Sequence, residues 1–278
     1  MSDATQMIAD SPMIQITDPR EARRIIRRGD YAGHTAGVAA DYVQGNLCIL
    51  PRDQAIEFAA FCQNNPKPCP LISVSVAGNP TPPGLGDIDI RTDVPQYRVY
   101  RDGVLTDEPT DIMRYWSDDL VTFVLGCSYS FELPLIKEGI AIQHISRNKS
   151  VPMYRTNIAC TPAGSFECNT VVSMRPLVPG DAIRAIQITS QFPEVHGAPV
   201  HIGLPELIGI EDLMKPDFGD APVISEGQLP VFWACGVTPQ VAVEQAKPAI
   251  CIAHRPGSML ITDIKNSELS NTVLSNTF

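Results

Sequence analysis

Several motifs that mark common enzyme classes are missing from the 278 residues of this chain. It has neither a GxGxxG nor a GxxxxGK[ST] segment, so nothing in it indicates a nucleotide-binding loop. It also lacks the GxSxG elbow that carries the nucleophile of many serine hydrolases. We therefore expect a protein that works without a cofactor.

Long apolar runs and long basic runs are missing as well. No apolar stretch approaches the roughly 18 residues of a membrane-spanning helix, and the first residues show neither part of a signal peptide. The formal net charge is −10. The densest group of basic residues is typical of a helix surface, not of a nucleic-acid footprint: Arg23, Arg24, Arg27 and Arg28. We expect a cytoplasmic protein that binds neither membrane nor nucleic acid.

The eight cysteines include no CxxC pair, and several lie inside apolar runs. A chain of this length can bury a substantial core without disulfides, so free thiols in a reducing compartment are expected. His196 and His201 are five residues apart, but the cysteines show no spacing that would add a third ligand. We therefore predict no metal site.

Hydrophobic residues make up 44% of the chain and charged residues 19%, which is typical of a globular protein. Helical spacing in RDQAIEFAAFCQN precedes the alternating strand PLISVSVAG. Further buried strands are expected at LVTFVLG, LPVFWACG and PAICIAH, with helices between them. This order predicts an α/β fold, a three-layer mixed α/β sandwich.

Residues 140–206 differ in character, because hairpin-like strands there surround a single expected helix, PGDAIRAIQITSQF. We interpret them as a smaller two-layer α+β subdomain, inserted into a main α/β body formed by residues 1–139 and 207–278.

Two strand-to-helix corners resemble each other. One passes from VTFVLG through Cys127 and Ser128 into a helix, and the other passes from PVFWA through Cys235 and Thr238 into a helix. If their strands are parallel, both corners face one cleft at the carboxyl ends of the sheet. Cys235 and Thr238 are therefore candidate binding residues.

The first corner is the strongest candidate site. A helix N-terminus offers unpaired amide donors and a partial positive charge, so Gly126, Cys127 and Ser128 can hold a carboxylate or an oxyanion. A capped helix with a buried structural thiol would show the same residues. Alternatively, Cys127 is a nucleophile whose pKa the helix terminus lowers. Glu132, near the first turn of this helix, is a candidate acid.

Arginines and histidines supply the remaining candidates. Arg155 and Arg175 lie in mostly uncharged, strand-like segments, where each either pairs with an internal carboxylate or binds an external one. Imidazole titrates nearest neutral pH, so a histidine can transfer protons. The other candidates are His196 and His201 for proton transfer, and Tyr154, Asn157, His34 and His254 for binding.

Ten segments, in this order, resemble the D-glutamate cyclase family of hydro-lyases: GHTAG, NLCILP, FCQNNPKPCPLI, DIDIRTDVPQYRVY, GCSYSFE, VPMYRTNIAC, VVSMRP, FPEVHGAPVHIG, PVFWACGVTPQ and HRPGSMLITD. The resemblance spans residues 14–265. It implies a lyase that interconverts D-glutamate and 5-oxo-D-proline plus water, on an α/β fold with a smaller inserted part. It transfers no established catalytic residues.

That reaction needs a cation for the α-carboxylate, donors for an oxyanion and a group that moves the amine proton. We assign these roles to Arg155 or Arg175, to the corner at Cys127, and to His196 or His201. Two alternatives remain open. One is a cofactor-independent racemase or epimerase that uses Cys127 and Cys235, and the other is a non-catalytic protein that binds a small carboxylate or amino acid. We further expect a homodimer.

Overall fold

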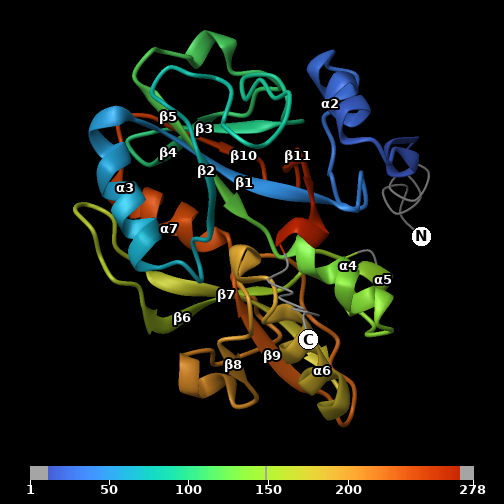
Figure 1. Cartoon of the computed structure of the whole chain (residues 1–278). Coiled ribbons are helices and arrows are strands. Elements are labelled where there is room, and N and C mark those ends of the chain that lie inside the picture. The colour runs from blue at the N-terminus through green and yellow to red at the C-terminus, as the bar shows by residue number, and fades with distance from the viewer. Residues whose placement is uncertain (1–11, 148, 270–278) are drawn as a thin grey trace, which may run out of the picture.

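The computed structural model describes residues 12–147 and 149–269. Helices surround two β-sheets, of which the larger occupies the upper half of Figure 1 and the smaller the lower half. The architecture is therefore mixed α/β, as predicted. The extreme ends of the predicted main body, residues 1–11 and 270–278, lie outside the described residues.

The larger sheet has the strand order β2-β5-β1-β10-β3-β4, and β11 also pairs with β1. The central strand β1 pairs with three others, and both β1 and β5 are almost entirely buried. The largely apolar sequence of β5 fits this burial, whereas Gln44 and Asn46 interrupt the apolar sequence of β1. The strands are β1 (Tyr42–Pro51), β2 (Leu71–Val74), β3 (Tyr97–Arg101), β4 (Val104–Asp107), β5 (Leu120–Gly126), β10 (Cys251–His254) and β11 (Leu260–Lys265).

The smaller sheet has the order β6-β7-β9-β8, with β6 (Met153–Ala159), β7 (Asn169–Leu177), β8 (His201–Ile202) and β9 (Leu229–Ala234). Strand β9 comes from residues that the sequence assigned to the main body, yet it pairs with β7 and β8. The sheets therefore do not follow the predicted boundary at residue 206. The division into a main body and an insert remains a prediction.

The expectation of parallel strands is wrong. Among the described residues, every pairing between named strands is antiparallel. Strand β5 belongs to the larger sheet and β9 to the smaller one, so the two similar corners are not neighbours along one sheet edge.

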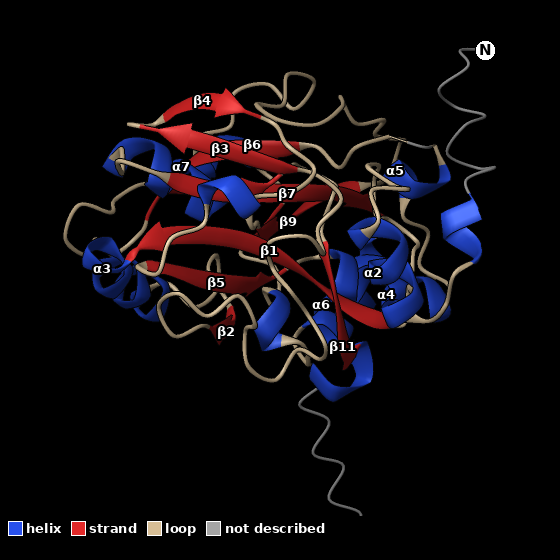
Figure 2. Cartoon of the chain, turned by 90° about the horizontal axis from the view of Figure 1, so that it is seen from above, coloured by secondary structure: helices blue, strands red, loops and turns tan. Residues whose placement is uncertain are grey.

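The α-helices are α2 (Pro19–Arg27), α3 (Arg52–Asn64), α4 (Tyr129–Lys137), α5 (Gln143–Ser146), α6 (Pro179–Thr189) and α7 (Val237–Ala246). Short 3-10 helices are η1 (Pro12–Gln15), η2 (Met113–Tyr115), η3 (Pro193–Val195), η4 (Pro205–Ile208) and η5 (Asn266–Leu269). Helix α2 begins as its sequence predicts, since Asp18 accepts a hydrogen bond from the Arg20 N–H and Pro19 takes the first position. Figure 2 shows α3 and α7 on one side of the strands and α2, α4 and α5 on the other.

Two helices tie the sheets together. Helix α4 follows β5 of the larger sheet, but its Phe131 ring lies 5.7 Å from the Trp233 ring of the smaller sheet. Helix α7 follows β9 of the smaller sheet, but its Val243 shares a hydrophobic cluster with Cys48 and Cys251 of the larger sheet. Each helix therefore contacts the other sheet as well as the one that precedes it. These contacts bring the two strand-to-helix corners together between the sheets.

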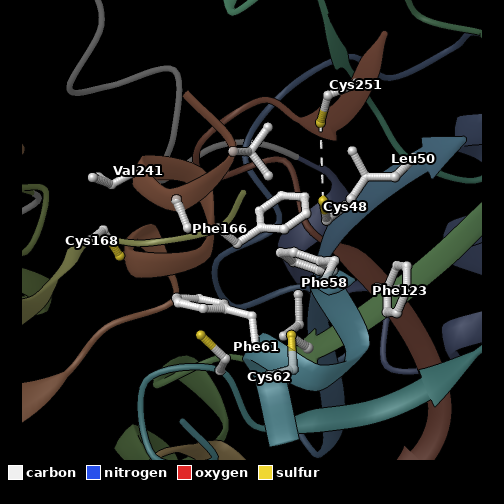
Figure 3. Close-up of a cluster of buried hydrophobic side chains, with 14 of the residues drawn as sticks. Cys48, Leu50, Phe58, Phe61, Cys62, Phe123, Phe166, Cys168, Val241 and Cys251 are labelled. Atoms are coloured by element: carbon white, nitrogen blue, oxygen red, sulfur yellow. Dashed lines mark hydrogen bonds between the residues drawn. The ribbon is translucent and has the colours of Figure 1, made fainter. Parts of the chain in front are cut away.

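Aromatic rings fill the core beside α3 (Figure 3). The Phe58 ring of α3 meets the Phe123 ring of β5 edge to face at 4.9 Å and the Phe166 ring at 5.2 Å. Burying one such ring contributes roughly 1.5–3 kcal/mol. The sulfur atoms of Cys48 and Cys251 lie 4.0 Å apart in the same cluster, and the eight cysteines are free thiols. In the part of the chain that the structure describes, no helix is long and apolar enough to cross a membrane.

Candidate functional site

The two corners line a single cleft of about 120 Å³. The α4 corner contributes Cys127, Ser128 and Tyr129, and the α7 corner contributes Cys235, Gly236, Val237 and Gln240. The remaining wall includes His34, Asn46 and His254. The cleft therefore joins two segments that lie more than a hundred residues apart in the chain.

Both corners require glycine because the chain is tightly packed there. A Cβ atom on Gly126 would lie 1.9 Å from the carbonyl oxygen of Glu194, and one on Gly236 would lie 2.5 Å from Nδ2 of Asn46. The same Asn46 Nδ2 donates a hydrogen bond of 2.8 Å to the carbonyl oxygen of Gly126. Asn46 on β1 thus holds the two corners at a fixed distance.

Each corner places a thiol at the start of its helix. The backbone N–H of Tyr129 donates to the sulfur of Cys127, and the N–H groups of Gly236 and Val237 donate to the sulfur of Cys235. Burial nevertheless raises the pKa of Cys127 to about 12, and it raises the pKa of Cys235 as well. Both side chains are therefore neutral thiols at pH 7. The predicted lowering of the Cys127 pKa is wrong, because burial outweighs the helix terminus.

His254 enters the cleft from the end of β10. The Leu47 N–H donates to its Nδ1 over 3.1 Å, so a neutral His254 carries its proton on Nε2. Burial lowers the pKa of His254 to about 4. The side chain is therefore a neutral imidazole that offers one fixed N–H donor.

His34 lies on a more exposed part of the wall. Burial, and after it the nearby Arg255 charge, lowers the pKa of His34. A Cβ atom on Gly257 would lie 2.0 Å from Nδ1 of His34, so this glycine makes room for the ring. At neutral pH His34 is unprotonated and can accept a proton.

A buried ion pair lies behind the α4 corner. Arg175 donates to Glu132 through both Nε and Nη2, and its Nη2 also donates to Ser128 Oγ at 3.2 Å. His144 Nε2 lies 3.2 Å from the same Glu132 oxygen. Burial alone would raise the pKa of Glu132, but Arg175 and then His144 lower it to about 2.

This pairing changes the roles predicted for both residues. Glu132 is an ionised carboxylate, not an acid. Arg175 is 1% exposed and its charge is neutralised inside the protein, so it is not available for an external carboxylate. The sequence left open whether Arg175 pairs with an internal carboxylate or binds an external one, and in the structure it pairs internally.

Comparison with known proteins identifies the family. Residues 121–263, which include both corners, match the family model described as D-glutamate cyclase. The chain is 60% identical over 259 residues to a protein of Pelagibacter ubique and 61% identical over 260 residues to one of Verminephrobacter eiseniae, both named "Putative hydro-lyase". These alignments cover 93% of this chain and 99% and 95% of the relatives.

The chain belongs to the D-glutamate cyclase family. Membership supports a hydro-lyase-like function. A solved nitrogen repressor-like protein of Methanococcus jannaschii covers 86% of the chain and 96% of its own, at 7% identity and a TM-score of 0.37. A likeness that weak carries no argument about fold or function.

In this family member, the predicted residues of β6 do not reach the cleft. The Tyr154 hydroxyl is buried and donates to the carbonyl oxygen of Leu213 at 2.6 Å. The Arg155 guanidinium is half exposed, over the Phe218 ring at 5.3 Å. Asn157 packs against the backbone near Gly209. Of β6, Met153 lines the cleft, but Tyr154, Arg155 and Asn157 do not, so Arg155 fails as a direct carboxylate ligand, as Arg175 does.

Three further predicted residues are also outside the cleft. His196 is buried, and its Nδ1 contacts the carbonyl oxygen of Lys67 at 2.9 Å. His201 lies on β8, where Nε2 contacts the carbonyl oxygen of Leu204 at 3.0 Å. Thr238, a candidate binding residue, is occupied instead by β7, because its hydroxyl bonds to both the N–H and the carbonyl oxygen of Val171. It fastens α7 to the smaller sheet.

The structure brings seven of the predicted residues to the cleft wall or immediately behind it: Gly126, Cys127, Ser128, Cys235, His34, His254 and, through Ser128, Arg175. Sequence reasoning missed Asn46, Tyr129 and Gln240. The signals for them were present, since Asn46 interrupts a buried apolar strand and the other two lie in the first turns of the two helices. No group of three or more potential metal-ligating side chains occurs in residues 12–147 and 149–269.

Proposed function

We propose that the cleft interconverts D-glutamate and 5-oxo-D-proline with release or uptake of one water molecule. One observation supports this best: two helices of nine and ten residues begin at the same cleft. Each helix N-terminus carries a partial positive charge, which stabilises an anion. D-glutamate has two carboxylates, so one helix can hold each of them.

The lack of an arginine on the cleft wall is consistent with this division of charge. The Arg175 charge behind Ser128 is balanced by Glu132, and no arginine is among the described residues that line the cleft. Binding therefore depends on backbone dipoles and neutral donors. A dicarboxylate that bridges the two helices satisfies both ends at once, whereas a monocarboxylate leaves one end unpaired.

His34 and His254 supply the proton chemistry. Cyclisation moves two protons from the ammonium group to one oxygen of the γ-carboxylate, which then leaves as water. In the proposed reaction, unprotonated His34 takes the first proton, and the freed amine attacks the γ-carbon. The Nε2–H of His254 donates a hydrogen bond to the oxyanion that develops, and His34 returns the first proton to the leaving oxygen. His34 then carries the second proton from the nitrogen to the same oxygen, the C–O bond breaks and water leaves.

The test is incubation of the purified protein with D-glutamate, L-glutamate and both enantiomers of 5-oxoproline. Mass spectrometry then follows the loss or gain of one water. We expect turnover of the D enantiomers, and we expect His34→Ala to lower it by about 100-fold or more, the usual contribution of acid–base catalysis. His201→Ala is the matched control and should keep turnover within about twofold. If neither enantiomer is converted in either direction, the proposed function is wrong.

A further inference from the structure

The cyclisation chemistry leaves the two thiols of the cleft without a role. Cys127 and Cys235 follow strands of different sheets, yet both line the same cleft, and the Cys235 charge raises the pKa of Cys127. Each sulfur accepts backbone N–H groups at a helix start. Two similar corners thus place the same chemical group at one cleft.

That arrangement matches a reaction in which a carbon atom is approached from both faces. We propose that Cys127 and Cys235 form an acid–base pair that exchanges the α-hydrogen of the carboxylate bound in the cleft and so inverts its α-carbon. The inference rests on the proposed function for the identity of the substrate, a glutamate or a 5-oxoproline. The activity itself, racemisation without a cofactor, goes beyond cyclisation.

The step balances without any further reactant. One cysteine, as thiolate, takes the α-hydrogen as a proton: the C–H bond breaks, an S–H bond forms, and the electron pair is delocalised into the carboxylate. The other cysteine, as thiol, gives its proton to the opposite face: its S–H bond breaks and a new C–H bond forms. Thiol and thiolate have then exchanged places, and the product has the opposite configuration.

The surroundings of the two sulfurs suit this step. The N–H groups of Tyr129, Gly236 and Val237 stabilise a thiolate at either corner, and the helix N-termini also stabilise the negative charge on the carboxylate. Burial makes each thiolate rare, but a thiolate whose conjugate acid has a raised pKa is also a stronger base towards carbon. Because one thiol must ionise, exchange should quicken as pH rises from 7 towards 10.

The experiment dissolves the full-length protein and each enantiomer of glutamate and 5-oxoproline in deuterated water. Mass spectrometry counts deuterium at the α-carbon, and chiral chromatography measures inversion. We expect both exchange and inversion with wild-type protein. Cys127→Ser and Cys235→Ser should each lower inversion by about 100-fold or more. Each variant should still exchange one enantiomer only, because the remaining thiol reaches one face.

Cys160→Ser is the matched control, since Cys160 and Cys235 are both 8% exposed but Cys160 is not part of the cleft wall. It should retain inversion and exchange. The proposal is overturned if wild-type protein interconverts glutamate and 5-oxoproline without any α-deuterium, or if Cys160→Ser loses inversion as fully as the cleft variants. Exchange without any change of one water would support the thiol pair and refute the cyclisation instead.

Discussion

Asn46 Nδ2 donates a 2.8 Å hydrogen bond to the carbonyl oxygen of Gly126, and no Cβ fits at Gly236 because that same nitrogen is in the way. One amide on β1 therefore determines how closely the two corners approach. The corners carry the thiols and the helix N-termini of the cleft, so the spacing of the whole site depends on a side chain that performs no chemistry itself.

Removing this amide should affect both stability and turnover. Asn46→Ala leaves the carbonyl oxygen of Gly126 buried without its donor, which costs about 1–3 kcal/mol of unfolding free energy. Urea titration measures that loss, and the cyclisation assay should show at least a tenfold drop because donor positions shift. Asn157→Ala, at an exposed position on β6, is the control and should change neither quantity appreciably. Equal effects of the two substitutions would contradict this role of Asn46.

The close approach at Gly126 predicts a second outcome. Gly126→Ala would press a methyl group into the backbone carbonyl of Glu194, which cannot move aside as a flexible side chain can. Overpacking of this kind costs roughly 1–3 kcal/mol, measurable as a lower urea midpoint. Gly180→Ala provides the comparison, because nothing lies within 4 Å of a Cβ there and the residue is helical. It should be neutral or slightly stabilising.

Breaking the buried ion pair of Glu132 and Arg175 should destabilise the fold. Glu132→Gln leaves the guanidinium uncompensated in a buried site, and breaking such a pair costs about 3–5 kcal/mol. The exposed pair of Glu138 and Arg184, with the two charges 3.6 Å apart, is the control, and Glu138→Gln should cost less than about 1 kcal/mol.

The effect of Glu132 should also depend on pH in a defined direction. Its folded-state pKa, about 2, lies below the ordinary value of 4.5. The ionised carboxylate therefore stabilises the fold fully above pH 4.5, and this contribution disappears as pH falls towards 2. Unfolding free energies of wild type and Glu132→Gln should converge over that interval. A constant difference would mean that the charge of Glu132 is not what stabilises the fold.

What the sequence could predict was local. The corner at Cys127 was recognisable because small and hydroxylated residues follow an unbroken apolar strand, and the echo at Cys235 repeats that pattern. The direction of strand pairing was not recognisable, because it depends on which distant strands meet. LPVFWACG reads as a buried strand whichever sheet receives it, so the pairing of β9 with β7 and β8 could not be predicted.

The sequence also could not predict which charged or polar side chains would pair with each other. Arg175 and Glu132 are 43 residues apart, and neither segment reveals that the other will neutralise it. The same holds for His196, which looks reactive beside a glycine but whose ring is fixed against Lys67, far from it in the chain. Local pattern identified where a site forms, while long-range packing decided which of its polar side chains stay available.

Buried His196 should make the stability of the fold depend on pH. Burial lowers the pKa of His196 to about 4 from an ordinary value of 6.5. Between these two pH values the unfolded chain binds a proton that the folded protein does not, so stability falls as pH falls across this interval. One such group contributes a slope of about 1.4 kcal/mol per pH unit.

Asn tolerates the positive φ of this position, so His196→Asn should remain folded and lose that slope. Urea titrations at several pH values between 4 and 6.5 measure it. His201→Asn, whose ring is on the partly exposed strand β8, should leave the slope of the wild type in place. An unchanged slope in His196→Asn would mean that His196 is protonated in the folded protein, and the site behind Gly126 would then carry a positive charge.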